Sequence, residues 1–482
     1  MGIIEIFNKN IAKIAPITFI ILTLIISLLK VPFFDETHAL IISQFNFSEI
    51  FQLTRIEGHP LLWYLILKPF NRLDWYPYSL DFINWIFSSL MIIVLWKYAP
   101  FNNFIKFLIT FSFPFFQYFG VVSRPYTLGV LIIFLLCALY KNATKKPILY
   151  SFLLVLCANI SIITLFVAFS FGVLFLYDLF KEKNIKKFDL CWIISLLVIE
   201  IILFCVQFLF YELPITQPTD KHIVFLKHFS YFVFNPFKDL SEKNINQILL
   251  HLFSFISFYY FAYLFIKKAK KSLVLFAITS TLMVITFLTF YIGAFWHYIF
   301  FLIVFICALW INWEKIKKEK IANILFILLL LLNTTSYSVS PKGKNEITFN
   351  TQTYKKILKI ITTNKYKNAK LFCFDSYERT SPGLLLYLKK QNIILYDNNN
   401  NPKDSFVSIR NLQNASYKTI DIEKFVSYLD KNKENYIISA TTNTNLQTNF
   451  YIQEKNTKLF LDLVETHPDL NLSIYKLQYK NF

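Results

Sequence analysis

The sequence predicts an all-α polytopic membrane protein with about eleven transmembrane helices, followed by a C-terminal extracytoplasmic α/β domain. Three observations support this fold class. Hydrophobic residues make up 55% of the 482 residues and charged residues only 16%, whereas a soluble chain carries roughly a quarter charged residues. Apolar runs long enough to cross a bilayer recur as far as residue 339. From residue 340 onward the chain is rich in Asn and Lys and has the composition of a soluble domain.

The apolar runs define the predicted spans. No small-residue cleavage site follows the first run, so we expect a retained span and not a removed signal peptide. The predicted spans lie near 12–31, 79–96, 104–120, 125–140, 147–160, 161–180, 189–210, 247–266, 272–292, 296–313 and 320–338.

The distribution of Lys predicts the orientation. Lys residues cluster in the loops between alternate spans, which is typical of the cytoplasmic side of a membrane. If the N-terminus is cytoplasmic, every cluster falls on that side, and an odd number of spans places 340–482 outside. We therefore expect a multi-pass protein of the cytoplasmic (inner) membrane with a periplasmic or extracellular C-terminal domain. The net charge of +19 is explained by these lysines at the membrane surface. No nucleic-acid-binding motif accompanies them, so nucleic acid is not an expected partner.

Two domains follow from these boundaries: a membrane domain over 1–339 and a soluble α/β domain over 340–482. The membrane domain has two long outer loops, at 31–79 and 211–246. In the first loop we expect two short amphipathic helices on the membrane surface, Glu36–Phe45 and Glu49–Thr54, with Ser48 as the N-cap of the second. The soluble domain alternates expected strands and helices. The strand-like runs are Lys370–Phe374, Asn392–Tyr396, Tyr436–Ala440 and Leu472–Gln478, and the helix-like runs are Thr353–Thr362, Ser381–Lys390, Ile420–Lys431 and Thr457–Glu465.

Three short motifs near the predicted outer face could carry chemistry. The first is Asp-Glu-Thr-His at 35–38, where an acidic pair could act as a general base, bind a metal, or simply favour the start of a helix. The second is Arg-Ile-Glu-Gly-His-Pro at 55–60, which is also compatible with a plain loop that enters a helix. The third is Ser-Arg-Pro-Tyr at 123–126, whose Arg could bind a lipid phosphate or extend to the head groups.

Together these motifs and their order resemble the GT-C glycosyltransferases of family 39, which include protein O-mannosyltransferases and bacterial aminoarabinose transferases. The resemblance is specific over about residues 30–130 and architectural from there to 339. It implies an inverting membrane glycosyltransferase with Asp35 as the catalytic general base and Glu36 as its neighbour. It also implies a sugar donor carried on a polyprenyl phosphate, and an envelope lipid, glycan or protein as acceptor, at the outer face of the membrane.

A donor of this kind needs cations that stabilise the leaving phosphate, opposite the carboxylate that takes the proton from the acceptor. Relatives often carry Arg at the position of His38 and Lys at the position of His59. Glu57 is the candidate on the acceptor side. No cofactor is predicted, and a divalent metal at the acidic pair stays an open alternative. The candidates for donor and phosphate binding are His38, His59, Arg124, Tyr126, Lys221, His222 and His297.

Two other function classes are alternatives. Glu200 lies in the middle of a predicted span, where an ionisable residue indicates either a proton relay in a transporter or flippase, or a carboxyl that is hydrogen-bonded inside the bundle. A transporter of this kind often contains internal repeats, and the sequence shows no such pattern. The third class is a non-catalytic scaffold that binds polyprenyl lipids, which would tolerate the loss of Asp35.

Overall fold

A computed structural model describes most of the N-terminal part of the protein and selected segments of the remainder. The described residues of the N-terminal part are 3–30, 34–57, 59–73, 78–182, 186–208, 229–234, 245–290 and 295–335. Beyond these, the described residues are 356, 359–363, 366, 368–373, 393–397, 399–402, 405, 422–439, 450–454, 457–467 and 472–481.

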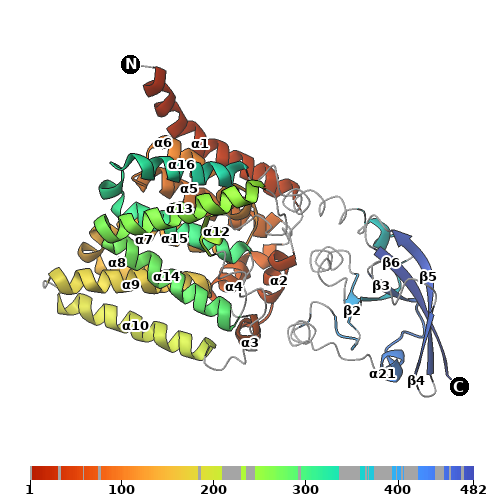
Figure 1. Ribbon diagram of the computed structural model, residues 1–482. Helices are drawn as coiled ribbons and strands as arrows, with labels where there is room; N and C mark the ends of the chain where they lie inside the picture. Colours follow the sequence, from red (N-terminus) through yellow and green to blue (C-terminus); the bar gives the residue numbers. More distant parts are fainter. Residues whose placement is uncertain are drawn as a thin grey trace. The chain divides into compact units, whose positions relative to one another are not determined.

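The described chain divides into two compact units. The first comprises 1–28, 58–63 and 81–343, and the second comprises 29–57, 64–80 and 344–482. The helices of the first unit form a bundle (Figure 1). They are α1 (Ile3–Leu29), α5 (Tyr78–Tyr98), α6 (Asn103–Phe111), the π-helix η2 (Pro114–Phe119), α7 (Pro125–Leu139), η3 (Tyr140–Lys145), α8 (Pro147–Ala158), α9 (Ile162–Glu182), α10 (Lys187–Phe208), α12 (Phe229–Phe234), α13 (Ile245–Lys268), α14 (Lys270–Thr289), α15 (Phe295–Ile316) and α16 (Lys320–Thr335).

Seven helices among the described residues are long and apolar enough to cross a membrane, so the protein is a helical membrane protein. Two further helices, Pro147–Ala158 and Lys320–Thr334, are apolar but shorter. The predicted span at 104–120 corresponds to α6 followed by the π-helix η2. The predicted number of eleven spans therefore stays a prediction. The seven candidate spans are Asn10–Leu29, Ser79–Tyr98, Pro125–Lys145, Ile162–Glu182, Ile248–Lys268, Lys270–Thr289 and Trp296–Ile316.

Helix α15 forms the centre of the bundle. Within its span 89% of the residues are buried, compared with 22% in α1, and a helix that is apolar on all sides and buried is typical of a membrane-protein core. It packs against α7, α12 and α14, and the rings of Phe261 and Phe305 join α13 to α15 with 4.8 Å between their centroids. Helices α8, α9 and α10 lie side by side at the edge of the bundle (Figure 1).

The second unit begins with short helices. They are α2 (Phe34–Ile42) and α3 (Phe47–Glu57), which confirm the two helices predicted for this segment, then the part of α4 (Leu62–Leu67) from residue 64 onward and η1 (Lys68–Leu73). The predicted N-cap Ser48 is wrong, because α3 starts one residue before it. Asn46 accepts a hydrogen bond from the backbone N–H of Glu49 at 3.0 Å, and the Glu49 carboxylate accepts one from the N–H of Asn46 at 3.1 Å. This reciprocal pair has the arrangement of a capping box.

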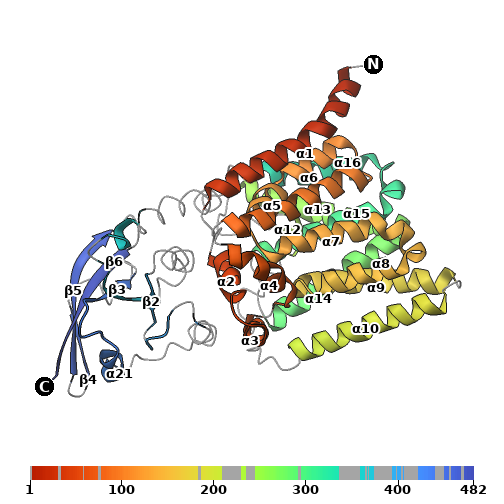
Figure 2. The ribbon, with the colours of Figure 1, turned by 180° about the vertical axis from the view of Figure 1, so that it is seen from behind.

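The C-terminal segment forms a mixed sheet of six described strands in the order β2-β1-β3-β6-β5-β4 (Figure 2). Strands β1, β2 and β3 pair in parallel, and the other pairings are antiparallel. Phe425 of the described helix α21 (Ile422–Ser427) packs on Phe372 and Tyr475 of the sheet core. The strands are β1 (Lys370–Cys373), β2 (Leu395–Tyr396), β3 (Asn435–Ser439), β4 (Phe450–Glu454), β5 (Thr457–His467) and β6 (Leu472–Asn481).

The strands predicted at 370–374, 436–440 and 472–478 are confirmed within the described residues as β1, β3 and β6, and of the strand predicted at 392–396 only Leu395–Tyr396 forms β2. The helix predicted at Thr457–Glu465 is wrong. This segment is β5, which pairs with β6 along its length. Leu459, Leu461 and Leu463 recur at every second residue, which is the period of a strand, and Leu461 is fully buried. The helix predicted at Ile420–Lys431 is confirmed only as the shorter α21. The helix predicted at Ser381–Lys390 lies outside the described residues, as does most of the one at Thr353–Thr362.

Candidate active site

Arg124 is fixed at the start of α7 by the residue that follows it. Pro125 occupies the first turn of the helix, where a missing N–H is tolerated, and a residue before Pro is driven into an extended conformation. Arg124 accordingly has φ −118° and ψ 158° and is the N-cap of α7. Its side chain is 9% exposed. The guanidinium carbon lies 5.3 Å from the ring centroid of Tyr126 and 6.0 Å from that of Trp296, within the range of a cation–π interaction.

Tyr126 is the centre of a cluster of basic side chains. Its side chain is completely buried, and its hydroxyl lies 3.0 Å from Nε2 of His297 on α15. The ring of His59 packs edge-on against Tyr126 with 6.2 Å between centroids, and the His297 ring does so at 5.9 Å. Three basic side chains from separate segments of the first unit, Arg124, His59 and His297, therefore lie next to the ring of Tyr126. All four residues were candidates from the sequence, and the structure brings them together.

A buried carboxylate holds the turn that precedes Arg124. Asp81 lies in the first turn of α5 and is 2% exposed. Its Oδ1 accepts a hydrogen bond of 2.8 Å from the hydroxyl of Ser123. Asp81 was not among the predicted site residues, because its partner Ser123 lies 42 positions away in the sequence. The one available signal was an acidic side chain inside the first turn of an apolar span, which is costly unless it has a role.

The backbone beneath the cluster is irregular. The carbonyl of Phe119, at the end of η2, accepts hydrogen bonds from the side chains of Asn84 at 3.3 Å and Thr127 at 3.0 Å. A π-helical turn is uncommon and is frequently found at functional sites. The next residue is Gly120, where an added Cβ would lie 2.9 Å from Cγ2 of Thr23. The glycine therefore permits the close approach of α1 to this turn.

The cluster around Tyr126 is suited to an anion. Arg124 is permanently charged and presents a planar set of donors that matches the oxygens of a phosphate. The two imidazoles add charge when they are protonated and hydrogen-bond donors when they are neutral. The aromatic rings of Trp296 and Tyr126 exclude water from part of this surface, which strengthens an electrostatic contact.

The acidic motif at 35–38 lies in the second unit, in the first turn and a half of α2. Glu36 is 1% exposed and forms an ion pair with Lys30, whose side chain is 5% exposed. The sequence analysis did not identify Lys30. Asp35 and His38 are half-buried, and their separation by three positions places them next to each other on the helix. Lys30 therefore compensates the charge of Glu36, and Asp35 is the more exposed of the two carboxylates.

Several predicted site residues have no described surroundings. Lys221 and His222 lie outside the described residues, and Glu57 ends α3 but its side chain is not among those described. Within the described part of the chain, no group of three or more His, Cys, Asp or Glu residues could hold a metal ion. Glu200 of α10 is half-buried and accepts a hydrogen bond of 2.6 Å from the amide of Asn159. This contact favours the interpretation of Glu200 as a carboxyl that is hydrogen-bonded inside the bundle.

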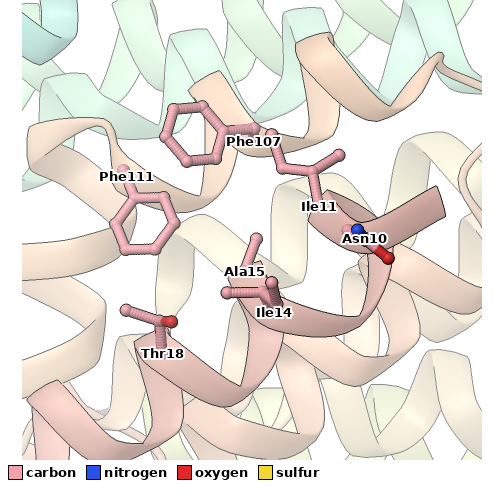
Figure 3. Close-up of a pocket in the computed structure, with 7 residues that line it drawn as sticks. All are labelled: Asn10, Ile11, Ile14, Ala15, Thr18, Phe107 and Phe111. Atoms are coloured by element: carbon pink, nitrogen blue, oxygen red, sulfur yellow. The ribbon is translucent and has the colours of Figure 1, made fainter. Parts of the chain in front are cut away.

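A hollow of about 390 Å³ lies between α1 and α6 (Figure 3). Its described wall contains Phe107, Phe111 and apolar residues of α1, together with the polar side chains of Asn10 and Thr18. None of these described lining residues is ionisable. The basic cluster around Tyr126 is therefore the stronger candidate for substrate recognition.

Comparisons with models of known families, with curated proteins and with solved structures found no match to this chain. The resemblance to family 39 therefore rests on the motifs between residues 30 and 130 and stays a prediction.

Proposed function

We propose that this protein is an integral membrane glycosyltransferase. It moves a sugar from a polyprenyl-phosphate donor to an envelope acceptor on the outer face of the cytoplasmic membrane, with inversion at the transferred carbon. The proposal includes a cytoplasmic N-terminus and an extracytoplasmic C-terminal domain, which the distribution of Lys favours. The motifs at 35–38, 58–61 and 123–126 resemble those of the family 39 glycosyltransferases, and this resemblance also supports the proposal.

The gathering of Arg124, His59 and His297 around Tyr126 is the observation that carries the proposal. Arg124 is almost completely buried, and the burial of a guanidinium in a membrane protein has a considerable desolvation cost. A phosphate offsets that cost through charge-assisted hydrogen bonds. Arg124 would also stabilise the negative charge that develops on a phosphate as it leaves the sugar, and the two imidazoles can donate hydrogen bonds to it, so the cluster would accelerate transfer as well as bind the donor.

In this proposal Asp35 accepts the proton of the acceptor hydroxyl or amine as that group attacks the anomeric carbon. The bond from the anomeric carbon to the phosphate oxygen breaks, and the polyprenyl phosphate departs with the electron pair. A positioned carboxylate typically contributes 10²–10⁴-fold to such a step.

Mass spectrometry of envelope lipids, glycans and proteins from cells with and without the protein tests the proposal. A transferase predicts at least one acceptor whose mass decreases by a single sugar residue when the protein is absent. A transporter or flippase predicts that the same products persist in altered amounts while the donor lipid accumulates on one side. A scaffold predicts products that stay unchanged when Asp35 is replaced. Either of these last two results would reject the proposed activity.

A further inference from the structure

Helices α13 and α14 form a hairpin through Ala269, and with α12 and α15 they enclose an apolar hollow of about 500 Å³. Half of the residues that line it are phenylalanines, among them Phe261, Phe276 and Phe305. On the α14 side the wall includes Ala277 and Thr281, which are exposed. The hollow is therefore a groove that is open along the hairpin.

The groove lies at the depth of the bilayer. Its walls on the hairpin belong to the candidate spans Ile248–Lys268 and Lys270–Thr289. At this depth the surrounding medium is hydrocarbon, and an apolar cavity does not attract water. The wall on α14 runs from Leu273 to Ile285, which corresponds to about 18 Å along a helix. An elongated apolar groove of this kind is suited to a hydrocarbon chain.

One end of the groove is positively charged. Lys270 is exposed and begins α14, and it precedes the wall residues Leu273 and Ala277 by three and seven positions, so it lies on the same face of the helix. The neighbouring Lys268 pairs with Glu319 and Lys271 pairs with Asp178. Lys270, by contrast, has no ion pair among the residues that the structure describes. The N-terminus of α14 adds a partial positive charge at the same place.

We propose that the hairpin of α13 and α14 binds one anionic glycerophospholipid, with its phosphate at Lys270 and one acyl chain in the phenylalanine-lined groove. The charge at the mouth and the apolar groove lie on one helix face, so a single molecule with an anionic head and a long chain is complementary to both. Basic positions at the ends of transmembrane helices are typical sites for anionic head groups. This lipid site is independent of the proposed sugar transfer.

Native mass spectrometry of the full-length protein in detergent, titrated with dioleoyl phosphatidylglycerol, tests the head-group contact. Lys270→Ala should weaken retention of one lipid about fivefold, because a basic residue near anionic lipid contributes roughly that factor. The matched control is Lys187→Ala, which removes an exposed lysine from the first position of α10. The control should bind as the wild type does. An equal loss in both variants, or equal retention of dioleoyl phosphatidylcholine, would overturn the proposal.

Two substitutions test the chain contact. Ala277→Trp fills the groove from α14 and Ala262→Phe fills it from α13, and each should abolish retention of the lipid in monodisperse protein. Leu252→Trp is the control, because Leu252 is exposed on α13 and does not line the groove. Retention of the lipid by both filled variants at the wild-type level would overturn the assignment. Loss of the lipid in Leu252→Trp to the same extent would also overturn it.

Discussion

The hydroxyl of Tyr126 and Nε2 of His297 lie 3.0 Å apart, so one hydrogen bond joins α7 to α15 across 171 positions of sequence. Tyr126 is completely buried at the point of contact. The bond therefore fixes the imidazole relative to Arg124, which stacks near the same phenol ring.

Replacing Tyr126 by Phe keeps the ring and removes the hydroxyl. We expect the variant to lose about 1 kcal/mol of stability through the missing hydrogen bond, and to show a higher KM for the lipid-linked donor because His297 is no longer held. Thermal unfolding in detergent and donor titration measure the two effects. An unchanged KM together with lowered stability would limit Tyr126 to a structural role.

Arg124→Lys keeps the positive charge and removes the planar set of donors. Because a charge-assisted hydrogen bond contributes about 1.5–3 kcal/mol, kcat/KM for the donor should fall roughly 10- to 100-fold. Arg55→Lys is the matched control, since Arg55 also lies near an aromatic ring, that of Phe51 on α3. Full activity in Arg124→Lys would show that the side chain contributes only as a point charge, and equal losses in both variants would remove Arg124 from the donor site.

The ion pair between Lys30 and Glu36 is almost completely buried. Glu36→Gln breaks this pair by removing the carboxylate that contacts the buried ammonium of Lys30, and breaking a buried pair costs about 3–5 kcal/mol. The double variant Lys30→Met, Glu36→Leu removes both charges and should recover most of that stability. Thermal unfolding of the three proteins measures the difference. A double variant that is no more stable than Glu36→Gln would contradict the pairing.

Burial and a hydrogen bond to Glu434 raise the pKa of Tyr436 in the C-terminal sheet to about 12. An unfolded tyrosine titrates near 10, so the unfolded chain releases this proton first as the pH rises. The contribution to stability is complete below pH 10 and is lost progressively up to about pH 12. Circular dichroism of the full-length protein across this range should show unfolding of the sheet that is less dependent on pH in Tyr436→Phe. Identical profiles in the two proteins would reject the assignment.

Periodicity and composition were sufficient to predict the parts of the fold that depend on local sequence. The apolar runs coincide with helices, and the parallel strands β1, β2 and β3 form where short apolar runs predicted them. The segment of β5 was predicted as a helix because its strand conformation depends on pairing with β6, which comes later in the sequence. The hydrophobic pattern of a short segment does not by itself distinguish these two states.

The residues of the candidate site also fall into those that the sequence could predict and those that it could not. Arg124 and His59 were recognisable because they lie in short motifs next to predicted spans, and His297 because it lies at the predicted outer end of an apolar span. Asp81 and Lys30 were missed because what identifies them is a partner, Ser123 in one case and Glu36 in the other. A buried charge is recognised by the charged or hydrogen-bonding group that pairs with it. That pairing exists only in the folded chain.

The central claim is that Asp35 is the base of a sugar transfer. Cells that lack the protein are complemented with the wild type or with Asp35→Asn at equal membrane abundance, and the rate of sugar incorporation into the envelope acceptor is followed by mass spectrometry. The account predicts that incorporation in Asp35→Asn falls by about 10²–10⁴-fold while the protein still inserts and folds. Incorporation by Asp35→Asn at the wild-type rate would contradict it.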